Sequence, residues 1–324
     1  MPAIETRDLQ RSFDDIVAVA GVDLEVSRGE IYAFLGPNGA GKTTTVRMLT
    51  TLLRPSGGSA RVAGHDVVED SAAVRRAIGV ALQEAALDPL MTGRELIQLQ
   101  STLHGLARDE AKRRGAALLR RVGLEQAADR RVGTYSGGMR RRLDLASALV
   151  HEPSVLFLDE PTTGLDPVSR KAIWEEVEKL NREGTTVFLT TQYLEEADKL
   201  ANRVGIIDNG EIVAEGTPAV LKAEVGHPHL EVVVADGTAE RAEEVLARFG
   251  KPLPAKDGAA LVELERGAAG VAPVVRALDD AGLLVERLDL VEPTLDDVFV
   301  EKTGYHLEGA EDAEAAEAAI EEQP

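Results

Sequence analysis

One eight-residue segment constrains the fold of this chain more than any other. It reads GPNGAGKT over residues 36–43 and matches the phosphate-loop pattern G-x-x-x-x-G-K-[ST]. An apolar run over 31–35 predicts a buried strand before it, and a helical pattern over 42–52 follows it. Glycines in such a loop let backbone amides face phosphates, and the N-terminus of the helix adds a favourable dipole. The order of strand, loop and helix predicts an α/β protein that binds a nucleotide.

The residues of this loop have separate expected roles. We expect Lys42 to reach the β- and γ-phosphates and the hydroxyl of Thr43 to bind Mg²⁺. The alternative is a plain glycine turn, but the strand before it and the helix after it favour a phosphate loop. The residues of this segment that we expect to bind the nucleotide are Gly36, Pro37, Asn38, Gly39, Ala40, Gly41, Lys42, Thr43 and Thr44.

A second apolar strand, over 155–158, ends in two carboxylates, Asp159 and Glu160. Ligands bind at the carboxyl ends of the strands in parallel sheets. We expect Asp159 to hold Mg²⁺ through water, and Glu160 to orient and deprotonate an attacking water. Taken alone, an acidic strand end is often only the start of a loop. Together with the phosphate loop, it predicts hydrolysis of a nucleoside triphosphate.

A serine and two glycines, Ser136-Gly137-Gly138, open a helix upstream of that strand. A hydroxyl and two bare amides at the positive end of a helix suit an anion. The alternative is an ordinary N-cap serine followed by glycines. The basic run that follows, Arg140-Arg141-Arg142, is typical of a solvated helix face.

Strands and helices alternate on both sides of these motifs, which predicts a parallel sheet covered by helices. Residues 92–150 are helical in pattern and begin with a capping box at Thr92 and Glu95, so we expect an inserted helical subdomain over about 84–150. The further strands expected are 3–9 and 16–26, with a turn over 11–15 between them, and 78–82, 186–190 and 203–207. The further helices expected are 168–182 and 193–201, and residues 55–58 are expected to stop the first helix.

The pattern changes around 223–229, which predicts an ATPase domain over 1–222 and a second domain over 229–304. The second domain has the order β-α-β-β-α-β, which suggests a small α+β unit of the ferredoxin-like kind. Its expected elements are 230–235, 238–249, 252–256, 260–264, 270–281 and 284–289, followed by a last helix over 293–303. The acidic tail, 305–324, has no hydrophobic face and is expected to be disordered.

Composition excludes several classes of protein. The 324-residue chain is 44% apolar and has no cysteine, so disulfides, thiolate metal sites and cysteine nucleophiles are excluded. No apolar run approaches the ~18–20 residues that span a bilayer, and the N-terminus lacks the pattern of a signal peptide, so we expect a soluble intracellular protein. A net charge of −20 makes it a poor candidate for general nucleic-acid binding.

Taken together, the motifs resemble the nucleotide-binding subunit of an ATP-binding cassette (ABC) transporter, and the resemblance covers about residues 3–222. In that family two subunits pair head to tail, and the Ser-Gly-Gly signature of each faces the γ-phosphate held by the other. The resemblance therefore assigns Ser136, Gly137 and Gly138 to the ATP bound by a second copy of the chain.

Three further residues are assigned by the same resemblance. Gln83 matches the family's glutamine that senses Mg²⁺ and lies against the membrane subunit, and Asp166 matches the anchor of the loop that crosses the dimer. Phe13 lies where the family stacks an aromatic ring on adenine, although a small core anchor explains it nearly as well. The implied ligands are ATP and Mg²⁺, with Mg²⁺ held by Thr43, Gln83 and Asp159.

One position departs from the family pattern. After the strand over 186–190 the family usually has a histidine that contacts the γ-phosphate, and this chain has Gln192. An amide donates a hydrogen bond but carries neither a proton nor a positive charge. We expect Gln192 to act in catalysis beside Glu160 and Lys42, with slow hydrolysis and no titration step from this residue. Tyr135 and Met139 also replace the usual residues that flank the signature.

Two segments resemble one group within the family, the daunorubicin/doxorubicin-resistance type. They are TTQYLEEA over 190–197 and TLDDVF over 294–299. The resemblance implies an ATPase subunit of an exporter that acts with a separate membrane permease at the inner face of the cell membrane. In that group the second segment helps subunits associate, and the alternative is a helix that packs on the chain's own core.

Two other functions remain open from the sequence. A soluble cassette ATPase that acts on ribosomes or DNA would carry two cassettes or long coiled coils, whereas this chain has one phosphate loop, one signature and no sustained heptads. An importer subunit would share every motif, so only Gln192 and the 294–299 segment favour export. A neighbouring gene for a multi-span membrane protein, without a binding protein, would favour export. The transported compound cannot be read from this chain.

Overall fold

The computed structural model describes residues 1–324 except 83–86, 236–238, 257–258, 265–266 and 308–324. Contacts divide the chain into two compact units, Met1–Pro218 with Tyr305–Pro324, and Ala219–Gly304. The predicted Gln83 and most of the predicted acidic tail lie outside the described residues. None of the described helices is long and apolar enough to cross a membrane.

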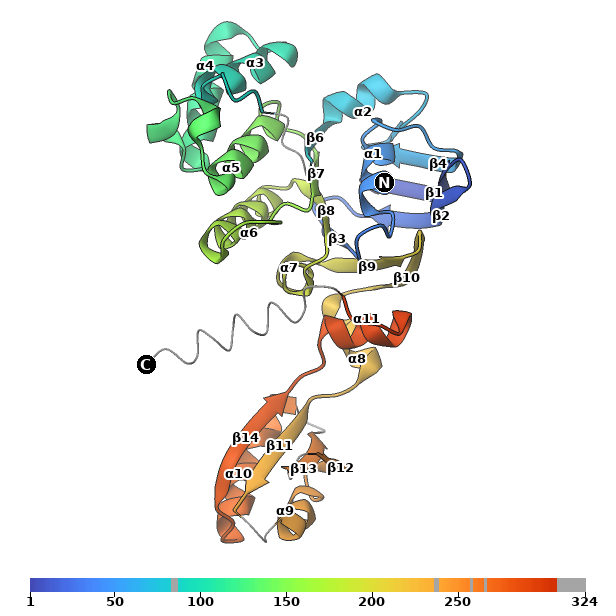
Figure 1. Cartoon of the computed structure of the whole chain (residues 1–324), viewed down its shortest axis with the longest axis vertical. Helices are drawn as coiled ribbons and strands as arrows, with labels where there is room; N and C mark the ends of the chain where they lie inside the picture. Colours follow the sequence, from blue (N-terminus) through green and yellow to red (C-terminus); the bar gives the residue numbers. More distant parts are fainter. Residues whose placement is uncertain (83–86, 236–238, 257–258, 265–266, 308–324) are drawn as a thin grey trace. The chain divides into compact units, whose positions relative to one another are not determined.

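A six-stranded sheet forms the centre of the first unit (Figure 1). Its strand order is β10 (Glu211–Gly216), β9 (Arg203–Asp208), β3 (Ile31–Leu35), β8 (Thr186–Thr191), β7 (Val155–Asp159) and β6 (Ile78–Ala81). All neighbours pair in parallel except β10, which is antiparallel to β9. Strands β3, β7 and β8 are buried along their whole length, as continuous apolar runs in a covered parallel sheet must be. The predicted α/β fold is confirmed.

Register places the ends of the central strands at one edge of this sheet. Leu35 at the end of β3 lies beside Thr191 at the end of β8, and Thr190 lies beside Asp159 at the end of β7. The residues that follow these three strands therefore meet at the carboxyl edge. This is the position at which parallel sheets bind their ligands.

An antiparallel sheet completes the first unit, in the order β2 (Ile16–Val26), β1 (Ile4–Phe13), β4 (Gly57–Val62) and β5 (His65–Asp66). The predicted turn over 11–15 is present but shorter, because β1 continues to Phe13 and only residues 14 and 15 turn the hairpin. The predicted helix over 42–52 ends earlier, as α1 (Lys42–Leu49). Gly57 and Gly58, expected as a helix stop, begin β4. The sequence predicted β1 and β2 but not β4 and β5, whose glycine and polar residues form no apolar run.

Helices cover the parallel sheet and share its core. Figure 1 shows α1 on one side of the sheet and α6 (Pro167–Arg182) and α7 (Leu194–Leu200) on the other. Residues from both sheets and from α1 form one hydrophobic cluster, which includes Phe34, Met48, Phe157 and Phe188. A short helix that the sequence did not predict, α2 (Ser71–Ala77), precedes β6.

The helical subdomain lies between β6 and β7 in sequence and contains α3 (Gly93–Leu103), α4 (Arg108–Arg121) and α5 (Gly137–Ala148). The capping box that the sequence predicted at the start of α3 is confirmed. The Thr92 hydroxyl accepts a hydrogen bond from the Glu95 amide, and the Glu95 carboxylate accepts one from the Thr92 amide.

The second unit contains a four-stranded antiparallel sheet in the order β12 (Gly250–Lys256), β13 (Ala259–Leu264), β11 (His229–Val234) and β14 (Val285–Val291). Helices α9 (Ala239–Leu246) and α10 (Val271–Asp280) pack with this sheet around one apolar core. The order of strands and helices matches the predicted β-α-β-β-α-β pattern. Likeness to the ferredoxin-like fold stays a prediction.

Two helices flank this sheet in the sequence, α8 (Pro218–Val225) before it and α11 (Leu295–Thr303) after it. A capping box between Thr294 and Asp297 starts α11, and Gly304 ends it in a left-handed conformation. Leu295, Val298 and Phe299 are all buried within the chain. Their burial favours packing inside the chain over a direct part in subunit association.

Candidate active site

The phosphate loop follows β3 directly, and its glycines are required by the surrounding backbone. A Cβ atom on Gly36 would lie 2.2 Å from the Ile207 carbonyl oxygen, and one on Gly41 would lie 2.4 Å from the Ala18 carbonyl oxygen. Gly41 and Gly39 also have positive φ angles of 104° and 84°, which glycine adopts without strain. A Cβ on Gly39 would meet nothing within 4 Å, so this part of the loop faces open space.

Lys42 is buried at the start of α1, and its side chain contacts the backbone of the phosphate loop. Its ammonium donates hydrogen bonds to the carbonyl oxygens of Gly36 at 2.6 Å and Pro37 at 2.9 Å. It also lies 3.5 Å from a carboxylate oxygen of Glu160. Burial lowers the pKa of Lys42, and the charges of Glu160 and Asp159 oppose that shift. The site thus places a desolvated cation where phosphate oxygens would enter.

Asp159 lies at the end of β7, and its two carboxylate oxygens differ in their hydrogen bonding. Its Oδ1 accepts hydrogen bonds from the hydroxyls of Thr43 at 3.2 Å and Thr190 at 2.5 Å. Its Oδ2 is buried and has no hydrogen-bond partner among the described residues. A carboxylate and a threonine hydroxyl are hard oxygen ligands of the kind that Mg²⁺ binds. The Oδ2 of Asp159, unpaired among the described residues, therefore fits a magnesium ion together with the nearby hydroxyl of Thr43.

Glu160 follows Asp159 in a left-handed conformation, with a φ angle of 47°. Its amide donates to the hydroxyl and the carbonyl oxygen of Thr190, at 3.0 and 3.1 Å. One oxygen of its carboxylate accepts from the Thr163 hydroxyl at 3.4 Å, and the other faces Lys42. A strained backbone held by several hydrogen bonds is common at functional sites. The carboxylate is thus fixed beside the phosphate loop.

Gln192 completes this edge of the sheet, because it follows β8, the strand between β3 and β7. The amide of Gly36 donates to the carbonyl oxygen of Thr191 at 3.3 Å, so the residue after Thr191 lies next to the loop. The side chain of Gln192 is partly exposed. The structure therefore brings Lys42, Asp159, Glu160 and Gln192 to one place.

Phe13 is a predicted site residue that lies on the surface. It ends β1, its side chain is 42% exposed, and the guanidinium of Arg11 lies 4.5 Å from the centre of its ring. One face of the ring is thus covered by a cation. Stacking of this ring on adenine stays a prediction.

The predicted signature turn starts α5, and Ser136 is its N-cap. The Ser136 hydroxyl accepts a hydrogen bond from the Met139 amide at 3.2 Å. Ser136 and Gly137 are exposed, and a Cβ on Gly137 would come no closer than 4.0 Å to Leu165. A Cβ on Gly138 would lie 2.6 Å from the Ser169 hydroxyl. Gly138 is thus required by the chain's own packing, whereas Gly137 is not.

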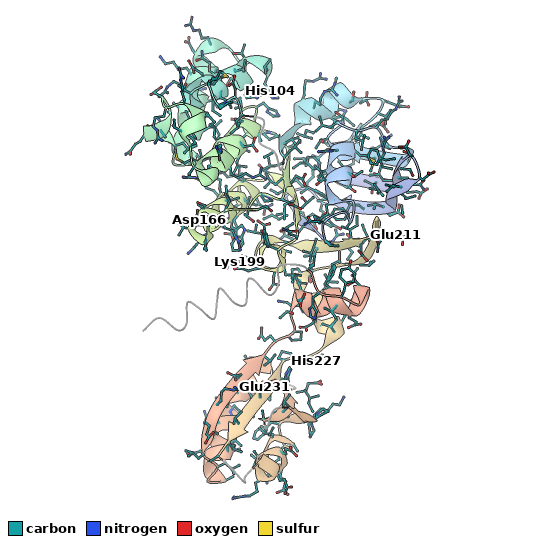
Figure 2. The ribbon with its side chains drawn as sticks, in the orientation of Figure 1. His104, Asp166, Lys199, Glu211, His227 and Glu231 are labelled. Carbon is teal, nitrogen blue, oxygen red and sulfur yellow. The ribbon has the colours of Figure 1, made fainter. Side chains whose placement is uncertain are left out.

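Asp166, labelled in Figure 2, is the N-cap of α6. Its carboxylate accepts hydrogen bonds from the amide of Ser169 at 2.9 Å and from the hydroxyl of Ser169 at 2.6 Å. These hydrogen bonds lower the pKa of Asp166. Ser169 also touches Gly138, so Asp166 and the signature turn lie side by side. Ser169 was not among the predicted site residues, although its position three residues after a helix cap at Asp166 was an available signal.

Two other residues near the signature have clear structural roles. Tyr135 is buried, and its hydroxyl donates to the Ala127 carbonyl oxygen at 2.7 Å, in a space that Gly93 leaves by having no Cβ. Arg141 is also buried, with 9% of its surface exposed, so the prediction of a solvated basic face is wrong at this position. The sequence carries no local signal for this burial, because the partners of Arg141 are carbonyl oxygens of segments distant in sequence.

Comparisons with known proteins identify relatives of this chain. Residues 19–163 match the family model described as ABC transporter. The chain is 46% identical to a daunorubicin resistance ATP-binding protein of Streptomyces coeruleorubidus, over 97% of this chain and 99% of that protein. It is 45% identical to a daunorubicin/doxorubicin resistance ATP-binding protein of Streptomyces peucetius, over 97% of this chain and 96% of that protein.

Two solved structures of ATP-binding cassettes are also similar to this chain. A dimeric bacterial ABC transporter cassette is 27% identical, with a TM-score of 0.62, over 66% of this chain and 98% of that chain. A dimeric ATP-binding cassette in a post-hydrolysis state, bound to ADP and Pi, is 26% identical, with a TM-score of 0.61, over 66% and 98%. The predictions of the cassette fold and of the family are confirmed. The chain belongs to the ABC transporter family, as an ATP-hydrolysing subunit of the daunorubicin/doxorubicin-resistance type.

Proposed function

We propose that two copies of this chain power an exporter by binding and hydrolysing two ATP molecules between them. The observation that carries the proposal is the grouping of Lys42, Asp159 and Glu160 at one sheet edge, while Ser136 and Gly137 stay exposed. A phosphate loop, a metal-binding carboxylate and a fixed second carboxylate are the parts that triphosphate hydrolysis needs. Exposed amides at a helix N-terminus are the part that a second copy would offer to the phosphate.

Each residue has a defined part in the proposed reaction. Lys42 exchanges the carbonyl oxygens of Gly36 and Pro37 for the phosphate oxygens of ATP and neutralises their charge. Thr43 and Asp159 would hold Mg²⁺, which when bound supplies charge stabilisation to the β- and γ-phosphates. Glu160 orients a water molecule and accepts its proton as the water attacks the γ-phosphorus. Gln192 donates a hydrogen bond to a γ-phosphate oxygen.

The second copy would close the site from the opposite side. In a head-to-tail pair each chain presents Ser136, Gly137 and the start of α5 to the γ-phosphate held by its partner. ATP then joins the two chains, because both of them bind the same phosphate. Hydrolysis removes this contact, and the pair opens. Asp166 and Ser169, which lie beside the signature turn, would follow the same movement.

A groove between the sheet and the helical subdomain would receive the membrane permease. It has a volume of about 400 Å³ and is lined by residues that include Leu52, Leu82, His104, Asp144 and His151. The rings of His104 and His151 stack with their centres 3.8 Å apart, and Figure 2 shows His104 on the side of the helical subdomain that faces the sheet. Exposed leucines on α3 and just before it, Leu90, Leu99 and Leu103, suit an amphipathic helix of the permease. The chain would then work at the cytoplasmic face of the cell membrane.

The names of the relatives supply the class of cargo. Both Streptomyces relatives are named for resistance to daunorubicin. A drug-like or lipid-like compound is therefore the proposed cargo, and its contacts would lie in the permease.

Transport in membrane vesicles tests this proposal. We expect inside-out vesicles that contain this chain and the permease encoded beside it to take up daunorubicin only when ATP is supplied. Vesicles with Glu160→Gln, which removes the proposed proton acceptor and keeps the size of the side chain, should lose this uptake. Equal uptake by the two kinds of vesicle would contradict the assignment of Glu160. Uptake in right-side-out vesicles instead would favour an importer.

A further inference from the structure

A single buried arginine connects three segments of the cassette. Arg141 lies on α5, and its guanidinium Nε donates to the Pro161 carbonyl oxygen at 2.9 Å. Its Nη2 donates to the Asp159 carbonyl oxygen at 2.7 Å, and its Nη1 donates to the Leu82 carbonyl oxygen. Nη1 also lies 3.3 Å from a carboxylate oxygen of Asp144, one helical turn further along α5. Every nitrogen of the guanidinium thus has a partner.

The three carbonyl oxygens belong to three segments with different expected roles. Leu82 follows the end of β6 and lines the groove below the helical subdomain. Asp159 ends β7. Its Oδ1 accepts a hydrogen bond from Thr43, and its Oδ2 has no hydrogen-bond partner among the described residues. Pro161 begins the stretch that leads to the α6 cap at Asp166. Arg141 itself stands one helical turn after the exposed signature residues, on the same rigid helix.

Burial makes this arrangement costly unless it is complete. A guanidinium withdrawn from water needs hydrogen bonds in the plane of its fork, and these carbonyl oxygens provide them. A lysine ammonium in the same space is a point charge, and it cannot reach carbonyl oxygens on separate strands with the same fixed geometry. If one of the three segments moved relative to the other two, Arg141 could therefore no longer keep all of its hydrogen bonds.

We propose that Arg141 is a positioning residue that transmits movement between the groove and the site of ATP hydrolysis. The inference rests on the proposed function, because it takes the groove to be the surface that meets the permease. When the permease moves Leu82, Arg141 carries that movement to Asp159 and Pro161 and to the start of α5. Arg141 touches no phosphate, so it acts through the residues that it holds.

The test compares Arg141→Lys and Arg141→Gln with wild type, each as the isolated chain and as the complex with its permease. We expect the affinity for a fluorescent ATP analogue to stay within about twofold of wild type, because Lys42 and the phosphate loop are untouched. We expect the permease to raise the kcat of wild type and to have almost no effect on the kcat of either variant. In the complex, kcat should fall roughly tenfold, in line with a small misplacement of catalytic groups. Arg113→Lys is the matched control, because Arg113 is exposed on α4.

The outcomes separate this proposal from the one on which it rests. If the permease does not stimulate wild type, the proposed function fails. If wild type is stimulated and both Arg141 variants are stimulated equally, the role of Arg141 is overturned. Parallel loss of ATP affinity and kcat, or failure of both variants to fold, would assign Arg141 to stability and would also overturn it. Loss of stimulation with ATP affinity preserved, and a normal Arg113→Lys, is the result that supports it.

Discussion

At the scale of single residues, Gln192 is the residue that we propose to contact the γ-phosphate from the end of β8. It follows β8 next to the loop, where an imidazole would add a proton and a positive charge. An amide at this place gives a hydrogen bond of unchanging strength across the physiological pH range. Hydrolysis by this chain should therefore show no titration step from this residue.

Two substitutions of Gln192 test this assignment. Gln192→Ala should lower kcat about fivefold, the loss of roughly 1 kcal/mol from one hydrogen bond. Gln192→His should make kcat rise relative to wild type as the pH falls through about 6.5, because the imidazole gains its charge there. Steady-state ATP hydrolysis between pH 5.5 and 8.5, read as a ratio to wild type at each pH, measures both effects. A kcat for Gln192→Ala equal to that of wild type would remove Gln192 from the site.

At the scale of elements, α5 shows a carboxyl group whose protonation is linked to stability. Burial raises the pKa of Asp144 to about 6, and the nearby charge of Arg141 opposes this rise. Between the pKa of an unfolded aspartate, about 3.9, and 6, the folded chain keeps a proton that the unfolded chain has released. The contribution of Asp144 to stability is therefore present below about pH 4 and is lost as the pH rises through 6.

A comparison with Asp144→Asn isolates this linkage. The unfolding free energy of wild type minus that of the variant should fall as the pH rises from 4 to 7, by up to about 3 kcal/mol. Urea unfolding followed by fluorescence measures it, because the chain's one tryptophan, Trp174, lies buried on α6. A difference that grows with pH would show instead that the ion pair with Arg141 outweighs the cost of burying the charge.

Some features of α5 could be predicted from the sequence, and others could not. Ser136 and the two glycines predicted an N-terminal turn because helix starts have a local pattern, and the strand end at Asp159 was as clear. Arg141 could not be predicted, because its partners are carbonyl oxygens of segments distant in sequence. Strand β4 and the hairpin strand β10 were missed for a related reason. Their polar and glycine residues pair through backbone hydrogen bonds that leave no apolar pattern.

At the scale of the whole molecule, the chain is incomplete as an enzyme in the proposed scheme. Its phosphate loop and carboxylates meet within one copy, whereas Ser136 and Gly137 lie exposed at the start of α5. Gly137 is also the signature residue whose own chain leaves room for a side chain. A change at Gly137 should therefore harm only the ATP held by a second copy.

Mixing two inactive variants tests whether each ATP site is shared between two copies of the chain. Lys42→Ala removes the cation of the phosphate loop, and Gly137→Asp places a carboxylate against the partner's phosphate at a helix end that tolerates it. Each variant alone should hydrolyse almost no ATP. In an equal mixture about half of the dimers pair the two variants, and each of these keeps one intact site, so ATPase activity should return to about a quarter of wild type. An equal mixture that stays as inactive as the separate variants would contradict a site shared between two copies.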